Sequence, residues 1–143
     1  MKNLLLIALA AITFFACKDP NQSASQDALN NIIEDTSKYT TVQWEANEVN
    51  FGAIKEGEKT TVKFKFTNTG DKPLYITSVT AGCGCTVPNY TKGAVAPGSS
   101  GEVTGEYNST NNSGKVEKYI TVVTNTKPEN TFRLIFTGEV MKK

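Results

Sequence analysis

Three cysteines are the residues of this chain best suited to chemistry, and they fall into two groups. Cys83 and Cys85 stand in the run Gly82-Cys83-Gly84-Cys85-Thr86, with one glycine between the two thiols. Cys17 stands alone, directly after the small residue Ala16 at the end of an apolar run. The pair indicates thiol or metal chemistry, whereas the single residue indicates attachment of a lipid.

Four interpretations of the cysteine pair are open. The first is a disulfide between the two residues. On a regular strand their Cα atoms would lie about 6.5–7 Å apart, which is at the limit for a bridge. The chain would therefore have to bend at Gly84. Such a strained bridge would suit thiol exchange. The second interpretation is metal binding, since two thiolates would suit Cu(I) or half of a zinc site. A nucleophile near Lys92 is the third interpretation, and packing as small apolar residues in a tight bend is the fourth. Packing or a local disulfide is favoured over redox and metal roles.

The N-terminal segment predicts export and attachment to a membrane. Lys2 precedes an apolar stretch from Leu4 to Ala16, and a positive charge, a hydrophobic run and a small residue are typical of a secretory signal. The cysteine that follows is typical of a bacterial lipobox, and an ordinary signal peptide followed by an incidental cysteine is the alternative. We therefore expect removal of residues 1–16 and acylation of Cys17. The run is shorter than the roughly 20 residues that a membrane-spanning helix needs.

Composition and charge exclude several classes of function. The chain has 15 basic and 14 acidic side chains, and removal of residues 1–16 takes away Lys2 alone, which leaves a balanced mature chain. No basic face for nucleic acid is therefore expected. Histidine is absent, which excludes histidine-based triads, HExxH zinc sites and Cys–His nucleophile pairs. We expect a protein without enzyme activity, without a cofactor and without a small-molecule ligand.

Residues 17–40 are expected to form a polar tether. The segment is rich in Asn, Gln, Ser and Asp, so it cannot offset the entropy of ordering by burial. Apolar residues between positions 28 and 33 recur at helical spacing, which allows a short helix over 26–34. A tether that is helical only transiently is the favoured interpretation.

Residues 41–143 are expected to fold as one all-β domain. Alternation of apolar and basic residues in Val62-Lys63-Phe64-Lys65-Phe66 is typical of a strand with one solvated face. Clusters of Gly, Pro and Asn separate about seven to eight such strands. Because one sheet would leave an apolar face exposed, we predict an immunoglobulin-like antiparallel β-sandwich, with a small barrel as the alternative.

Turn chemistry marks several connections between these strands. Asn68-Thr69-Gly70 fits a hairpin turn that needs a left-handed residue. Pro97-Gly98 would fix φ and then reverse the chain. The residues expected to form turns are Gly52, Asn68, Gly70, Gly84, Pro97 and Gly98.

Several short motifs resemble a known bacterial family. They are Asn50-Phe51-Gly52-Ala53-Ile54, Glu56-Gly57-Glu58, Phe66-Thr67-Asn68-Thr69-Gly70, Cys83-Gly84-Cys85-Thr86, Ala96-Pro97-Gly98, Gly114, Thr124-Asn125 and Gly138-Glu139-Val140. In this order they resemble the DUF1573 family, over about Val49 to Val140. The resemblance implies an immunoglobulin-like sandwich related to Hydin-type and major-sperm-protein-type domains, which are mostly scaffold and interaction modules. It implies no specific activity.

Together these features predict a bacterial envelope lipoprotein with a binding or structural domain. The expected partners are the membrane, through the lipid on Cys17, and an envelope protein that adds a strand to an exposed sheet edge. The outer membrane is favoured over the inner one. One alternative is a thiol-redox or Cu(I)-handling protein that uses Cys83 and Cys85. Another is a carbohydrate- or surface-binding module that uses exposed aromatic residues such as Tyr90 and Tyr107. For Tyr107 a place in the core or an interface is favoured, because it lies in register with Val103.

Overall fold

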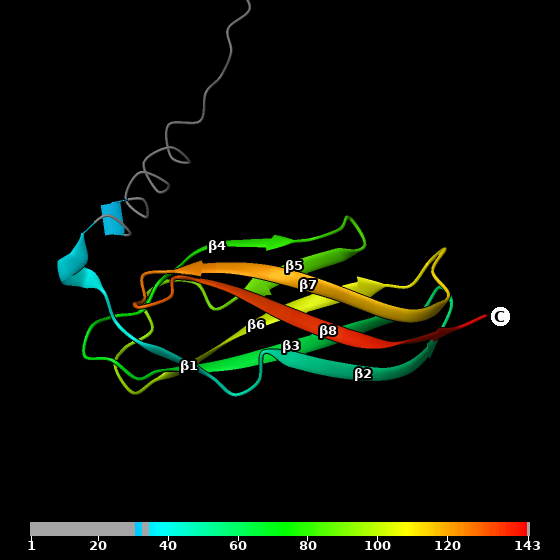
Figure 1. Cartoon of the computed structure of the whole chain (residues 1–143), viewed down its shortest axis with the longest axis horizontal. Helices are drawn as coiled ribbons and strands as arrows, with labels where there is room; N and C mark the ends of the chain where they lie inside the picture. The colour runs from blue at the N-terminus through cyan, green and yellow to red at the C-terminus, as the bar shows by residue number, and fades with distance from the viewer. Residues whose placement is uncertain (1–30, 33–34, 143) are drawn as a thin grey trace, which may run out of the picture.

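The computed structural model describes residues 31–32 and 35–142 and shows a two-layered all-β domain (Figure 1). Asn31 and Ile32 are helical, but the rest of the short helix expected over 26–34 lies outside the described residues, as do the expected signal peptide and Cys17. No helix of the described part is long and apolar enough to cross a bilayer. The elements are η1 (Thr36–Lys38), a 3-10 helix, and the strands β1 (Val42–Trp44), β2 (Glu48–Lys55), β3 (Lys59–Asn68), β4 (Ile76–Ala81), β5 (Thr86–Tyr90), β6 (Ser100–Asn108), β7 (Gly114–Thr124) and β8 (Thr131–Met141).

The strands form two four-stranded sheets, which confirms the predicted sandwich. One sheet has the order β1-β3-β6-β5 and the other the order β2-β8-β7-β4. One pair departs from the antiparallel arrangement: β2 runs parallel to β8, with Glu48 opposite Ile135 and Lys55 opposite Met141. Residues 45–47 alone separate β1 from β2. The chain therefore passes to the second sheet without reversing and meets β8 in the same direction.

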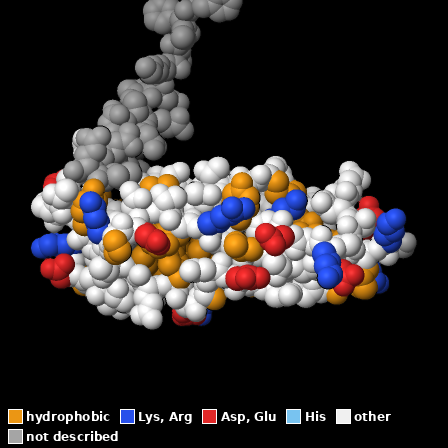
Figure 2. All heavy atoms as spheres, in the orientation of Figure 1, with side chains coloured by type: hydrophobic (Ala, Val, Ile, Leu, Met, Phe, Trp, Pro, Cys, Tyr) orange, Lys and Arg blue, Asp and Glu red, His pale blue; other side chains and the backbone are white. Residues whose placement is uncertain are grey.

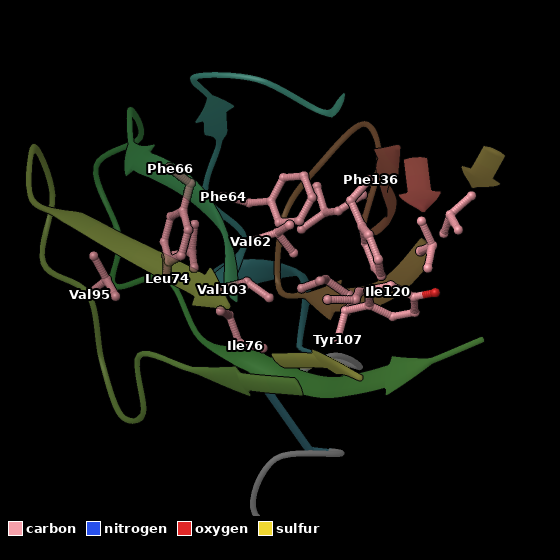
Figure 3. Packing of buried hydrophobic residues seen from close by; sticks show 14 residues of the cluster. Val62, Phe64, Phe66, Leu74, Ile76, Val95, Val103, Tyr107, Ile120 and Phe136 are labelled. Atoms are coloured by element: carbon pink, nitrogen blue, oxygen red, sulfur yellow. The ribbon is translucent and has the colours of Figure 1, made fainter. Parts of the chain in front are cut away.

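Side chains from both sheets meet in one hydrophobic core (Figure 3). On β3, Val62, Phe64 and Phe66 are at most 2% exposed, while the lysines between them are exposed to solvent. Leu134 and Phe136 of β8 are fully buried in the same cluster from the opposite sheet. Burial of one such side chain contributes roughly 1.5–3 kcal/mol, so the alternation predicted from sequence is the main source of stability.

A buried polar network closes the end of the domain at which residues 35–40 enter. The side-chain amide of Asn125, fully buried, donates to the carbonyl oxygens of Lys38 and Pro73 at 2.7 and 3.0 Å. Its carboxamide oxygen accepts from the N–H of Tyr75 at 2.7 Å. The domain therefore contacts Lys38, which lies in the segment expected to form the tether.

Asn68 forms a second buried centre at this end. Its carboxamide oxygen accepts from the hydroxyl of Thr40, and its amide donates to the carbonyl oxygens of Lys72 and Val95. The hairpin turn expected here is wrong, because β3 and β4 belong to different sheets and the segment crosses between them. Gly70 has no positive φ; it is needed for space, since a Cβ would collide with the side chain of Thr40.

Two other glycines from the expected turn residues do lie at positive φ. Gly98 has a φ of +74° after Pro97, and its N–H donates to the carbonyl oxygen of Asn68 at 2.8 Å. Gly52 has a φ of +81° at an irregularity inside β2, where the pairing with β8 shifts register. The first glycine reverses the chain before β6, and the second distorts an edge strand.

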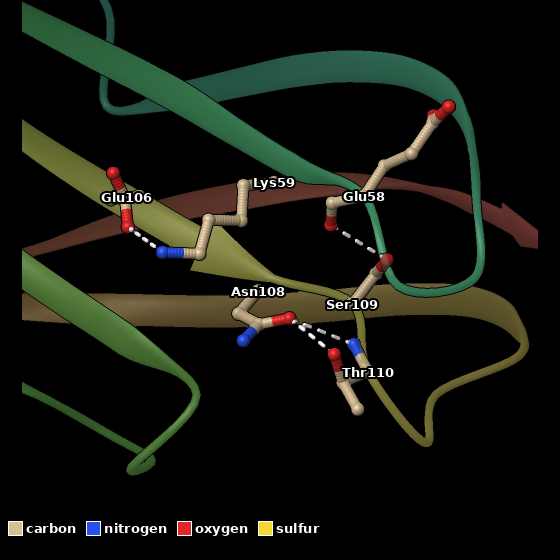
Figure 4. A network of polar contacts seen from close by, with 6 residues as sticks. All are labelled: Glu58, Lys59, Glu106, Asn108, Ser109 and Thr110. Atoms are coloured by element: carbon tan, nitrogen blue, oxygen red, sulfur yellow. Dashed lines mark hydrogen bonds and ion pairs between the residues drawn. The ribbon is translucent and has the colours of Figure 1, made fainter.

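Hydrogen bonds to Ser109 hold the opposite end of the domain together (Figure 4). The hydroxyl of this fully buried residue lies 3.0 Å from the carbonyl oxygen of Lys55 and 2.8 Å from that of Glu58. The β2–β3 turn is thereby fixed to the segment after β6. Lys59 and Glu106 form an ion pair of 2.9 Å beside it, but both side chains are about half exposed, so the pair contributes little.

Candidate interaction surface

Cys83 and Cys85 form a disulfide at a corner of the sandwich. Their sulfur atoms lie 2.06 Å apart and their Cα atoms 5.3 Å apart. The bridge lies in residues 82–85, which are bent rather than extended and carry the chain from β4 in one sheet to β5 in the other. In this form of the chain neither cysteine offers a free thiolate to a metal or to a substrate. The interpretations that need free thiols therefore apply only to a reduced form.

Both sheets hold this corner in place. The N–H of Gly82 donates to the carbonyl oxygen of Tyr119 on β7 at 3.0 Å, and the N–H of Asn108 donates to that of Cys85 at 2.9 Å. The ring of Tyr119 lies against Gly82, where an added Cβ would approach it to 2.7 Å. On the same ring, the guanidinium carbon of Arg133 lies 3.8 Å from the centroid. The corner is therefore a fixed part of the framework.

Metal-ligating side chains do not cluster in the described part of the chain. No three His, Cys, Asp or Glu side chains of the described part gather where they could hold a metal ion. A groove of about 510 Å³ crosses β2, β8 and β7, and its lining includes Asn50, Lys115, Glu117, Thr137 and Glu139. Its charged residues are exposed, and it contains no cysteine.

The structure does not support the use of Tyr107 as an exposed binding residue. Tyr107 is fully buried, and its ring packs on Phe51 and Phe136 with centroid distances of 5.6 and 5.7 Å. Its hydroxyl has no hydrogen-bond partner among the described residues, and burial raises the pKa of this hydroxyl. Tyr90 is half-buried and packs against the same core. The prediction that Tyr107 belongs to the core is confirmed, and the surface-binding alternative loses this residue.

Four strands lie at sheet edges, and one of them, β5, is chemically blocked against strand addition. Residues 85 and 91 of this segment bond to β6, so residues 86, 88 and 90 direct their main-chain groups toward the open edge. Pro88 has no N–H to offer. The N–H of Tyr90 is taken by the side chain of Asn89 at 2.9 Å. A partner strand would therefore find few donors on β5.

The edges β1 and β2 are also unsuitable for strand addition. β1 has three residues, which limits any ladder built on it. β2 is interrupted at Gly52, whose N–H is bonded by the side chain of Asn50 at 2.7 Å. Further along, the N–H of Lys55 is bonded by Glu58 at 2.8 Å. Irregularities and occupied donors of this kind prevent edge-to-edge association in natural sheets.

The fourth edge strand, β4, has none of these blocking features beyond a bulge at its start. Along an edge strand, successive residues direct their main-chain groups alternately toward the neighbouring strand and outward. Because the N–H of Gly82 bonds to β7, Ser78 and Thr80 also bond to β7, whereas Val79 and Ala81 point their N–H and C=O groups outward. The strand contains no proline and no charge, and the pairing irregularity lies before Ser78. The end of β4 is fixed by the disulfide corner. Among the residues that the structure describes, none pairs with the outer side of β4, which is therefore a rigid and open edge.

The side of the molecule that includes β4 is also unusually poor in charge. No charged residue occurs between Lys72 and Lys92, although 20% of the chain is charged. This interval contains β4, the disulfide corner and β5. In Figure 2 the rim along β4 shows neither acidic nor basic side chains, while the neighbouring face carries both. Depletion of charge is typical of the central part of protein interfaces.

Comparison with solved structures identifies the same sandwich in other proteins. A protein of unknown function from Porphyromonas gingivalis W83 matches with a TM-score of 0.63 and 16% identity, over 73% of this chain and 49% of that one, so this chain spans about half of its length. The ASH/PapD-like domain 7 of human CEP192 matches with a TM-score of 0.60 and 10% identity, over 97% and 99% of the two chains. The VesB protease of Vibrio cholerae matches with a TM-score of 0.52 and 15% identity, over 79% and 35%. At these identities the likeness shows the fold alone.

Comparison of sequences gives the family. No curated protein matches the chain. The family model described as "Protein of unknown function (DUF1573)" matches residues 42–140, which include all eight strands and the disulfide corner, apart from the last residue of β8. This chain therefore belongs to the DUF1573 family.

Proposed function

We propose that this protein is a lipid-anchored, non-enzymatic binding module of the bacterial cell envelope, which takes up a strand of a protein partner along β4. The observation that carries the proposal is the contrast between the four sheet edges. Three are short, irregular or deprived of donors, whereas β4 presents the outward main-chain groups of Val79 and Ala81 within a charge-free side. Main-chain hydrogen bonds along such an edge provide affinity for an extended segment.

The position of the tether supports this role. Residues 38–40 join the domain at the end closed by Asn125, and β4 starts at the same end, because the N–H of Tyr75 is bonded to that side chain. From there β4 runs away from the tether along the length of the sandwich (Figure 1). A domain held at a membrane through Cys17 would leave this edge accessible over its whole length.

A role without catalysis fits the chemistry of the described residues. They bring together no metal site, and the chain contains no histidine. Proteases occur among the proteins with a similar fold, but this chain covers 35% of the length of the VesB protease. Fold likeness of this kind does not carry the activity of the whole protein.

The anchor is tested by the mass of the protein isolated from its native host. We expect a chain that starts at Cys17 and carries fatty acyl groups, together with the loss of two hydrogen atoms for the disulfide. A product that retains residues 1–16, or that starts at Cys17 without lipid, would contradict the anchoring part of the proposal.

Binding along β4 is tested by photo-crosslinking in the intact envelope. A photoreactive amino acid in place of Thr80, which is exposed on β4, should capture the same protein in repeated experiments. The matched control replaces Lys63, which is exposed on the opposite sheet, and should capture it at least roughly tenfold less. Ala81→Pro should abolish capture at Thr80, because it removes an outward N–H without removing a bond to β7. Equal capture at both positions would contradict a role for this edge.

A further inference from the structure

We propose that the strand added to β4 is β4 of a second copy of this chain, in an antiparallel pair centred on Thr80. The inference rests on the proposed function, because it uses the same edge and names its partner. Two sandwiches would then share one continuous sheet, in which each copy contributes the order β2-β8-β7-β4. A two-fold axis perpendicular to that sheet would relate the two copies, and two-fold symmetry is the commonest symmetry of homodimers.

The main-chain groups of β4 fit this register. In an antiparallel pair, residues with outward groups must lie opposite each other to exchange both hydrogen bonds. With Thr80 on the axis, Val79 lies opposite Ala81 of the second copy, and Ala81 lies opposite Val79. Both residues direct N–H and C=O outward, so every outward group of this short segment finds a partner.

The side chains are also compatible with self-association. Thr80 would lie opposite Thr80 in the closely spaced type of pair, and cross-strand threonine pairs are favourable. Ser78 would lie opposite Gly82, where there is no side chain to obstruct it. Because Pro73 to Thr91 contains no charge, two identical sides would meet without like-charge repulsion. Charged side chains are one device by which natural sheets prevent this contact, and β4 has none.

The size of the contact makes the expected dimer weak and reversible. A stable interface buries at least about 1,200 Å² in total, which pairing along one six-residue strand does not reach. Attachment of both copies to one membrane raises their effective concentration and offsets this weakness. The association is therefore expected in the envelope and not in dilute solution.

Single cysteines in the native envelope test the register. Thr80→Cys should form a disulfide-linked dimer under mild oxidation, because the two Cα atoms would lie about 4.5 Å apart. Ser78→Cys is the matched control: in this register each Ser78 lies four positions from its own counterpart, roughly 13 Å along the strand. We expect at least tenfold less disulfide-linked dimer from Ser78→Cys than from Thr80→Cys. The same oxidation of the unsubstituted chain measures any dimer that forms through Cys17. Similar yields at both positions, or no dimer at Thr80→Cys, would overturn the proposed pairing.

A charge exchange distinguishes a second copy from a different partner. Thr80→Lys and Thr80→Glu each place like charges opposite each other, so the recovery of one tagged copy together with a differently tagged copy of the same variant should fall about fivefold. Co-expression of the two variants with different tags should restore this recovery, since unlike charges then face each other. Unchanged melting temperatures would show that the fold is intact. If the mixed pair of Thr80→Lys and Thr80→Glu copies is recovered no better than either variant alone, pairing between two copies of this chain is contradicted. If the photoreactive residue at Thr80 then captures a different protein, the proposed function stands and this inference falls; if it captures nothing, both fall.

Discussion

Two glycines at the disulfide corner are subject to different constraints at the scale of single residues. A Cβ on Gly82 would lie 2.7 Å from the ring of Tyr119, whereas a Cβ on Gly84 would meet nothing within 4 Å. Neither residue has a positive φ. The space around them, and not the backbone conformation, therefore decides what each position tolerates.

We expect Gly82→Ala to destabilise the protein by about 1–3 kcal/mol, because the ring of Tyr119 must move and its stacking with Arg133 is disturbed. Gly84→Ala should be neutral or stabilising by up to about 1 kcal/mol, since it restricts the unfolded chain. Urea unfolding of both variants measures the difference. A larger loss for Gly84→Ala than for Gly82→Ala would contradict the described packing.

Tyr107 gives the domain a dependence on alkaline pH. Burial raises the pKa of its hydroxyl above the ordinary value of 10.0, because the ionised form would lose its hydration. The unfolded chain therefore loses this proton first as the pH rises. Titration of this hydroxyl leaves the stability unchanged below about pH 10, and the stability falls as the pH rises from there through the pKa of the folded state.

We expect Tyr107→Phe to reduce the loss of stability above about pH 10. Near neutral pH the variant should be as stable as the parent or more stable by up to about 1 kcal/mol, because an unpartnered buried hydroxyl is removed. Unfolding free energies measured across this pH range check both effects, with Tyr75→Phe as the control at a half-buried position. An unchanged alkaline profile for Tyr107→Phe would show that another group controls it.

At the scale of elements, the disulfide corner connects the end of β4 to the start of β5. The bridge closes a loop of three residues, so it removes little entropy from the unfolded chain. The corner is also held by hydrogen bonds to β6 and β7. Its framework therefore does not depend on the bridge alone.

Replacement of both Cys83 and Cys85 by Ser should accordingly lower the free energy of unfolding by no more than about 2 kcal/mol. We expect the fold and capture at Thr80 to persist, as measured by thermal unfolding and by the crosslinking experiment above. Loss of cellular function with stability and capture unchanged would instead support a thiol-redox or copper-handling role. The two outcomes separate a structural bridge from a reactive one.

At the scale of the whole molecule, the segment that leads from the tether is part of the folded domain. The carbonyl oxygen of Lys38 accepts a hydrogen bond from the side-chain amide of Asn125. Thr40 is 4% exposed, and its hydroxyl donates to the side chain of Asn68. The region matched by the family model begins at residue 42, after these contacts. The chain therefore needs residues outside that region to complete its buried polar network.

A chain that starts at Val42 should melt at least roughly 5 °C below one that starts at Asp35, because Asn68 and Asn125 then lose partners in a buried site. A chain that starts at Lys18 serves as the reference for the complete mature length and should match the Asp35 variant. Thermal unfolding by circular dichroism measures the three midpoints. Equal melting of all three chains would show that residues 35–41 contribute nothing to the domain.

The local pattern of the sequence predicted much of the fold, but not how its strands pair. Alternation from Val62 to Phe66 identified a half-buried strand, because side-chain direction in a strand follows sequence position. The same reasoning placed Asn68 in a hairpin, since turn chemistry does not reveal that the next strand belongs to the other sheet. The parallel pair of β2 with β8 joins the two ends of the domain, which no local pattern records.

The sequence by itself determined the all-β class, the family and the poverty of charge around β4, because periodicity, motif order and composition are local properties of the chain. The tertiary structure alone decided that Asn125 holds the entering chain, and that β4 is an edge whose outward groups are open. These properties depend on which distant segments become neighbours. That choice is made by the packing of two whole sheets, and it has no signature in any short stretch of residues.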